Sequence, residues 1–219
     1  MKLSKETLAI FKNFASINTN LLIKPGNVIS TMATNKTVLA KVTVAETFTE
    51  EFGIYDLGEF LGALSLFESP ELEFDKKFVQ IKESSESIKF YSADASVLIA
   101  PTKDIKFPDA DVVFNLTANQ LAKIQKTASV LRASDLTIRG EDGKMTLLVG
   151  DKKNVTGNSF STEVGDTDKK FTININVDNL KMLPGDYTVS VSNKKISQFK
   201  SDSTDLIYYV AVEADSVID

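Results

Sequence analysis

The chain has 219 residues, an apolar content of 42% and a formal net charge of −5 at pH 7, which allows one large domain or two small ones, each with its own hydrophobic core. It contains no cysteine and no histidine, so disulfides, Cys/His zinc sites and nucleophiles activated by histidine are excluded. Catalysis would have to rely on carboxylates, lysines or a bound metal. The composition therefore favours a function other than catalysis.

Neither a membrane span nor a secretion signal is visible in the sequence. No stretch approaches the roughly 20 apolar residues that a membrane-spanning helix needs. The first residues, 1–6, lack the apolar core of a signal peptide, so we expect a cytoplasmic protein. The negative net charge, taken alone, argues against nucleic-acid binding, which usually involves a basic surface. The distribution of charge along the chain decides this question.

The first half of the chain begins with a predicted amphipathic helix, Ser4–Asn18, for which Ser4 is a suitable N-cap. Its apolar side comprises Leu8, Ile10, Phe11, Phe14, Ala15 and Ile17. Short runs typical of β-strands follow at 20–24, 28–33, 37–44 and 47–54. A shorter helix is expected from Asp56 to Phe67, and its two glycines, Gly58 and Gly62, indicate close packing against another backbone. A hairpin is expected over 78–91, with its turn at Ser84 and Ser85.

The segment 93–111 differs from its surroundings because it has two prolines, several charged residues and no periodicity. We interpret it as an extended linker between two domains, residues 1–92 and 112–219. Beyond it the order of elements recurs, with a long helix, strands, a short helix and further strands. The corresponding predictions are a helix over 117–134, a hairpin turn at 141–143, strands at 159–164 and 171–177, a helix over 178–183, and strands at 187–191, 195–200 and 206–213. This recurrence predicts two copies of one fold.

Positive charge gathers on the two long predicted helices. Residues 1–20 contain three lysines and one glutamate, and residues 117–134 contain three basic residues and no acidic one. The rest of the chain is strongly acidic. The lysines lie opposite the apolar face of each helix. A solvated helix face would explain either helix alone, but two basic helices at matching positions in a repeat favour a surface that attracts phosphates without reading sequence.

Several blocks of the chain resemble the sliding clamps of T-even-type bacteriophages. They are Met1–Lys5, Lys12–Ala15, Ile54–Leu57, Phe60–Gly62, Asn179–Tyr187 and Tyr208–Ser216. The last block is the most specific, and the order and length of the elements agree along essentially the whole chain. The resemblance implies an α+β DNA clamp fold, in which two similar domains each pack two helices on antiparallel sheets. It also implies a head-to-tail homotrimer that closes into a ring.

The resemblance implies the function of a DNA polymerase processivity factor, with no enzymatic activity, cofactor or metal. The residues implied to line the ring and face DNA are Lys5, Lys12, Lys123, Lys126 and Lys181. Arg132 lies off this arc of lysines. A pocket for C-terminal peptides of partner proteins is also implied, and its candidate residues are Leu98, Ile105, Phe107, Tyr208 and Val210. Ordinary packing in the core or under the linker is an alternative for each of the five.

The implied partners are double-stranded DNA, the phage DNA polymerase, an ATP-driven clamp loader, and late transcription factors acting with the host RNA polymerase. The implied location is the cytoplasm of the infected bacterium. Two other classes remain open from the residues alone. A β-rich virion structural protein would share the strands and turns but has no need of basic helices. A carboxylate-dependent enzyme has no supporting cluster of residues. Separately, the acidic runs at 50–51 and 109–111 lack the spacing of a calcium loop and are interpreted as solvated faces.

Overall fold

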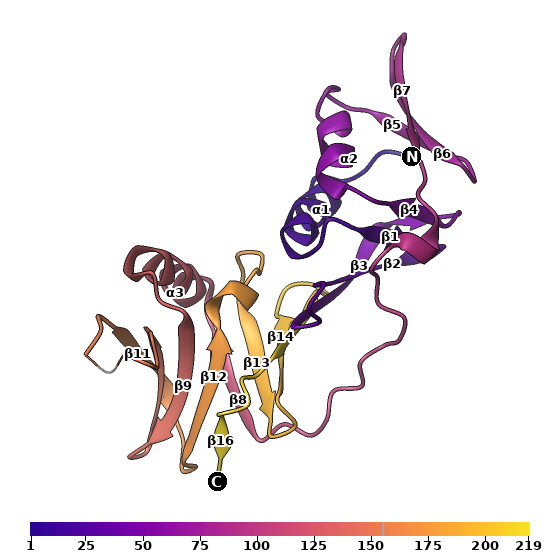
Figure 1. The fold of residues 1–219 in the computed structure, drawn as a ribbon. Coiled ribbons are helices and arrows are strands. Elements are labelled where there is room, and N and C mark those ends of the chain that lie inside the picture. The colour runs from indigo at the N-terminus through magenta and orange to yellow at the C-terminus, as the bar shows by residue number, and fades with distance from the viewer. Residues whose placement is uncertain (155) are drawn as a thin grey trace. The chain divides into compact units, whose positions relative to one another are not determined.

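A computed structural model describes residues 1–154 and 156–219 of the chain (Figure 1). The chain divides into two compact units, Met1–Asp104 and Ile105–Asp219. The boundary falls inside the segment 93–111, whose first part is bound to the first unit: Ala93 N donates to Gly53 O at 2.8 Å and Ile99 N donates to Asn20 Oδ1 at 3.0 Å. The finer division into 1–92, 93–111 and 112–219 stays a prediction.

The first unit combines two α-helices with small antiparallel sheets. Its elements are α1 (Lys5–Ile17), β1 (Leu21–Ile23), β2 (Gly26–Met32), β3 (Val38–Phe48), β4 (Phe52–Ile54), α2 (Leu57–Leu64), β5 (Glu71–Phe74), β6 (Phe78–Glu83), β7 (Glu86–Tyr91) and the 3-10 turn η1 (Ala95–Val97). Strand β1 pairs with β4, β2 pairs with β3, and β6 lies between β5 and β7. The predicted hairpin at 78–91 is therefore confirmed as β6 and β7.

Helix α1 forms where the sequence predicts it, because the N-cap residue and the helical spacing of the apolar residues mark the same segment. The Ser4 Oγ accepts from Thr7 N at 3.1 Å and so satisfies a free N–H of the first turn. The buried face packs on α2 and β3 and includes Phe11 and Phe14, both 0% exposed. Phe60 of α2 extends this core, with its ring centroid 6.4 Å from that of Phe11 and 5.1 Å from that of Phe90. Helix packing in this unit thus rests on aromatic side chains.

The second unit has one α-helix and two antiparallel sheets. Its elements are β8 (Val112–Leu116), α3 (Ala118–Leu131), β9 (Asp135–Glu141), β10 (Lys144–Gly150), β11 (Phe160–Asp166), β12 (Phe171–Asn176), the 3-10 turn η2 (Val177–Asn179), β13 (Tyr187–Ser192), β14 (Ile196–Ser201), β15 (Ile207–Ala211) and β16 (Val217–Ile218). One sheet has the order β11-β10-β9-β12-β16. In the other, β14 lies between β15 and β13, and β8 pairs with the far side of β13.

Two local signals in the second unit are confirmed. Asp142 and Gly143 have φ angles of 53° and 80°, which suit the tight turn that joins β9 to β10. Helix α3 begins at Thr117 with a complete capping box, since Gln120 N donates to Thr117 Oγ1 at 3.3 Å and Thr117 N donates to Gln120 Oε1 at 2.9 Å. The apolar face of α3, with Leu121 and Ile124 buried, packs on β10.

Two predicted elements are wrong. The helix expected over 178–183 is only the turn η2, followed by irregular chain. Leu180 and Met182 are buried while Lys181 between them is exposed, and this alternation does not suit a helix, in which residues on one face recur every three or four positions. The single strand expected over 47–54 is interrupted after Phe48, so that β4 is a separate strand.

The expectation that Gly58 and Gly62 pack against another backbone is also wrong within the described residues. A Cβ on Gly62 would meet no atom within 4 Å, and one on Gly58 would meet only Asp56 Oδ1 at 3.1 Å. Both glycines are exposed. They therefore lower the stability of α2 without a packing requirement inside the chain.

Replacing Gly62 by alanine is expected to raise the free energy of unfolding by about 1 kcal/mol, because alanine loses less backbone entropy in a helix and meets no atom here. Urea unfolding followed by circular dichroism measures the change. Gly53→Ala is the contrasting control, since its Cβ would lie 2.3 Å from Ala93 O and should destabilise the chain. A Gly62→Ala chain that is no more stable than the wild type would contradict the argument.

Candidate functional site

The first group of candidate residues lies on α1. Lys5 and Lys12 are both exposed, and their spacing of two helical turns places them on one side of the helix. Both line the same hollow beside α2. Within residues 1–154 and 156–219 neither lysine forms an ion pair. Their charges are therefore open to an external anion.

The second group lies on α3. Lys123 and Lys126 are exposed and one turn apart, so they share a face. The Lys123 Nζ lies 4.9 Å from the ring centroid of Phe160 in β11, a cation–π contact that holds the side chain near that strand. Lys126 has no ion-pair partner in the described part of the chain. Since α3 contains no acidic residue, both charges on this face are positive.

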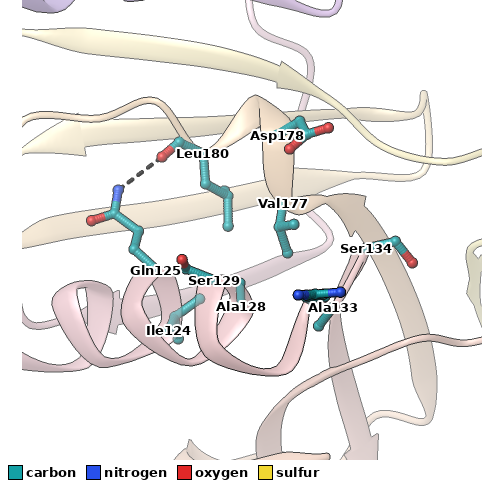
Figure 2. Close-up of a pocket in the computed structure, with 10 residues that line it drawn as sticks. Ile124, Gln125, Ala128, Ser129, Ala133, Ser134, Val177, Asp178 and Leu180 are labelled. Atoms are coloured by element: carbon teal, nitrogen blue, oxygen red, sulfur yellow. Dashed lines mark hydrogen bonds between the residues drawn. The ribbon is translucent and has the colours of Figure 1, made fainter. Parts of the chain in front are cut away.

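The segment that contains Lys181 is hydrogen-bonded to α3. Gln125 Nε2 donates to Leu180 O at 2.8 Å, as Figure 2 shows. The two elements enclose a hollow of about 540 Å³ between α3 and η2. Arg132 also lines this hollow and caps α3 with a φ of 52°. The exposed Lys181 is thus held beside the helix that contains Lys123 and Lys126.

A carboxylate from β3 completes the cap of α1. Ser4 N donates to Glu46 Oε1 and the Thr7 hydroxyl donates to Glu46 Oε2, both at 2.5 Å. Burial raises the pKa of Glu46, but hydrogen bonds from Thr7 and from the Ser4 backbone outweigh this, so that its pKa is lowered. No local pattern in the sequence indicates this contact, because Thr7, three residues after the N-cap, has no carboxylate to complete a capping box. Glu46 performs that role from a distant strand.

Glu46→Gln is expected to lower the free energy of unfolding by about 1 kcal/mol at pH 7, since it weakens the cap of α1. The lowered pKa means that the contribution of Glu46 is fully present above its unfolded pKa and is lost as pH falls through the folded one. The difference between wild type and variant should therefore be constant at neutral pH and shrink below pH 4.5. Urea unfolding at neutral and acidic pH measures it, and a difference independent of pH would contradict the assignment.

The candidate pocket residues fall into different environments. Ile105 and Phe107 are partly exposed in the second unit, and the Phe107 ring stacks on Tyr209 at 6.3 Å. Leu98 belongs to the first unit, where it lies against Gly53 of β4. Tyr209 is not among the pocket residues predicted from the sequence. The signal for it was the alternation of β15, in which every second side chain faces outward.

Tyr208 and Val210 belong to the core, because both are 0% exposed. The Tyr208 hydroxyl accepts from Leu183 N at 3.1 Å, and the Tyr187 hydroxyl donates to Leu183 O at 2.7 Å. Burial raises the pKa of Tyr208 to about 12, so it stays a neutral phenol. Tyr208 and Val210 therefore pack in the core of the second unit and do not line an open pocket. The two tyrosines instead fix the segment that follows Lys181.

Within the described residues, no three Asp, Glu, His or Cys side chains gather where they could hold a metal ion. In the same part of the chain, no helix has the length and apolar character needed to cross a membrane.

Relatives of the chain match it along its whole length. The sliding clamp of Enterobacteria phage T4 is 34% identical over 227 residues, covering 100% of both chains. The sliding clamp of Vibrio phage KVP40 is 33% identical over 222 residues, covering 98% of this chain and 100% of the relative. The chain belongs to the sliding-clamp family. Family models agree: the DNA polymerase processivity factor model matches residues 4–100 of the clamp, and the model of the gp45 sliding clamp C-terminal region matches 113–214.

Solved structures show the same fold at lower identity. PCNA from A. fulgidus, bound to the C-terminal region of FEN-1, aligns with a TM-score of 0.73 at 11% identity and covers 99% of this chain and 100% of that one. The Helicobacter pylori beta clamp, bound to a DNA ligase peptide, has a TM-score of 0.73 at 13% identity and covers 98% of this chain and 65% of that one. The predicted α+β DNA clamp fold is confirmed. The clamp functions as a DNA polymerase processivity factor, and the virion-protein alternative is not supported.

Proposed function

We propose that three copies of this clamp close head to tail into a ring that encircles duplex DNA and tethers the phage DNA polymerase at the primer end. The ring has no enzymatic activity and no cofactor. In each copy, residues 1–92 and 112–219 are the two clamp domains, and 93–111 connects them. Tethering by topology raises the effective concentration of the polymerase at the primer without strong binding to DNA.

The observation that carries this proposal is the pair of basic helix faces in an acidic chain. Lys5, Lys12 and Lys126 are exposed and free of ion pairs in the described residues, while the net charge of the whole chain is −5. Lysines attract phosphates as point charges, without sequence readout. Weak and interchangeable contacts of this kind, with Lys123 and Lys181 included, would let the ring slide. The acidic remainder would repel duplex from the other surfaces.

Head-to-tail closure needs two different surfaces on each copy. In the described residues, β7 and β11 each end a sheet, with a pairing partner on one side only. Tyr91 of β7 is 68% exposed, a large aromatic surface on a strand whose edge is unpaired. We assign the joint between copies to backbone pairing of β7 with β11 of the next copy, since unpaired edges are templates for such addition.

The proposed partners besides DNA and polymerase are an ATP-driven clamp loader and late transcription factors with the host RNA polymerase, in the cytoplasm of the infected bacterium. Two structurally similar clamps are described as bound to a FEN-1 C-terminal region and to a DNA ligase peptide, which supports peptide binding here. We place the peptide pocket of the second unit at Ile105, Phe107 and Tyr209. These three side chains are only partly buried.

Light scattering after size exclusion is expected to give about three times the chain mass of 24.0 kDa, and primer extension on a long template should produce longer products only when clamp and loader are both present. The unpaired edges allow head-to-tail association, the resemblance to T-even-type clamps implies three copies, and the longer products follow from tethering. A monomer at every concentration would contradict the ring. Product lengths that do not depend on the clamp would contradict the tether.

A further inference from the structure

The two sheets assigned to the joint between copies each have a second end. Strand β7 ends the sheet β5-β6-β7, whose other end is β5. Strand β11 ends the sheet β11-β10-β9-β12-β16, in which the last long strand at the other end is β12, with the two-residue β16 beside it (Figure 1). An unpaired strand edge is a template for any strand that reaches it. If β5 and β12 were open, each sheet could therefore add a copy at both ends.

The outer edge of β5 is covered by Met1. In an antiparallel pair every second residue turns its N–H and C=O away from the partner strand. Leu72 is such a residue of the four-residue β5, since its N donates to Met1 O at 2.7 Å and its O accepts from the Met1 amino group at 2.6 Å. These two bonds occupy both backbone groups that Leu72 would offer to a further strand.

The outer edge of β12 is covered by the segment that contains β16. Thr172 of β12 lies opposite Val217 of β16. Two positions along the strand, Asn174 N donates to Ser216 Oγ at 2.8 Å and Asn174 O accepts from Glu213 N at 2.8 Å. Alternate residues of this kind are the ones whose backbone faces away from the neighbouring strand β9. The positions at which another strand would pair are therefore already occupied.

Side chains fasten the segment 213–218 to the rest of the second unit. Lys152 Nζ donates to Asp215 Oδ1 at 3.0 Å, and Lys195 Nζ donates to Ser216 O. The Lys152 side chain is only 21% exposed, so its ion pair with Asp215 is partly shielded from water and salt. A segment of the same chain also has an effective concentration of about a millimolar. Another copy at micromolar concentration is therefore a weak competitor for this edge.

We infer that Met1 and residues 213–218 are edge covers, which confine strand addition to β7 and β11 and so direct the copies into the head-to-tail contact that closes a ring. Pairing of β7 with an open β12, or of β11 with an open β5, would join copies through a different rotation and continue as open chains. This inference rests on the proposed joint between β7 and β11, and it explains why the other end of each sheet does not compete with that joint.

The test compares the wild type with a chain that lacks residues 214–219, by light scattering after size exclusion across a micromolar dilution series. The wild type should stay at three chain masses. The shortened chain should become about twofold heavier or more as concentration rises, because β12 is open to β7 of a further copy. Adding Tyr91→Asp should reduce it to single chains, since β7 takes part in both contacts. A chain without residues 1 and 2, with Leu3→Met as its first residue, should associate similarly through β5.

Leu206→Ala is the matched control, because Leu206 is buried directly before β15 and its loss destabilises the second unit without opening the β12 edge. It should keep three chain masses. Circular dichroism reports whether each variant is folded. Asp215→Ala with Ser216→Ala, which loosens the cover in the full-length chain, should also form heavier species and serves as the test if the shortened chain does not fold.

The inference is overturned if the folded variants with an opened β12 edge keep the wild-type mass, if Leu206→Ala associates equally, or if the heavier species persist with Tyr91→Asp. Each of these results leaves the wild-type ring intact. A wild type that is itself a single chain at every concentration would instead contradict the proposed ring. The failure of the edge covers and the failure of the ring are thus distinguishable in one series of measurements.

Discussion

Reversing the charges of Lys123 and Lys126 to glutamate is expected to shorten the DNA copied per loading event by about tenfold or more while the trimer remains intact. Each lysine–phosphate contact contributes about 1 kcal/mol in water, and about 1.4 kcal/mol corresponds to a factor of ten. Both side chains are exposed on α3, so neither reversal disturbs the core. Lys123 also loses its contact with Phe160, which at an exposed site contributes only about 0.5–1 kcal/mol.

Primer extension on a long template over a range of salt concentrations measures the effect. The wild type should lose processivity as salt rises, and the variant should depend less on salt because fewer counterions are released. Lys76→Glu with Lys77→Glu is the matched control, since it changes the net charge equally at two exposed lysines in the turn before β6. If the α3 variant and this control gave the same product lengths, the role of Lys123 and Lys126 would be refuted.

Helices α1 and α3 were predictable because their local signals agree with their packing. Ser4 acts as the cap that the sequence indicates, Thr117 caps the helix that was expected to begin there, and the apolar residues three and four apart are those that become buried. Once the buried side of such a helix is known, its exposed side follows. This is why Lys5, Lys12, Lys123 and Lys126 could be placed on the surface from sequence alone.

The features that escaped prediction depend on partners distant in sequence. Glu46 caps α1 from a strand about forty residues away, and no local pattern indicates this. The short helix expected at 178–183 failed because Leu180 and Met182 are fixed by the core and Leu183 by two buried tyrosines. Tertiary contacts of this kind override the intrinsic preference of a short segment.

The pocket candidates show that a strand can be predicted from sequence while the side chains on its buried face are not. The strand predicted over 206–213 is confirmed as β15, but adjacent residues of a strand point to opposite faces. Tyr208 and Val210 occupy the buried face of β15, and Tyr209 is the side chain that meets Phe107. Apolar residues occur on both faces of this strand, so its composition could not decide which face is buried.

Tyr91→Asp is expected to dissociate the ring into single chains at micromolar concentration and to abolish clamp-dependent primer extension. Tyr91 is 68% exposed on β7, and exposed aromatic side chains at an interface commonly contribute about 2 kcal/mol or more. The new carboxylate would also place a charge against β11, where Lys144 already pairs with Glu163 at 3.9 Å and with Asp166 at 2.8 Å. Because every copy in the ring has the substitution, binding free energy is lost at every joint, and a single substitution should suffice.

The fold itself should survive this substitution, since the Tyr91 side chain is mostly solvent-exposed and its ring neighbour is Phe78 at 5.9 Å. Light scattering across a dilution series gives the mass, and circular dichroism confirms the secondary structure. Tyr55→Asp is the matched control, because Tyr55 is 64% exposed but lies outside β7 and β11; it should keep the trimer mass. A Tyr91→Asp chain that still has three times the monomer mass at low concentration would remove β7 from the joint and leave the ring without its assigned contact.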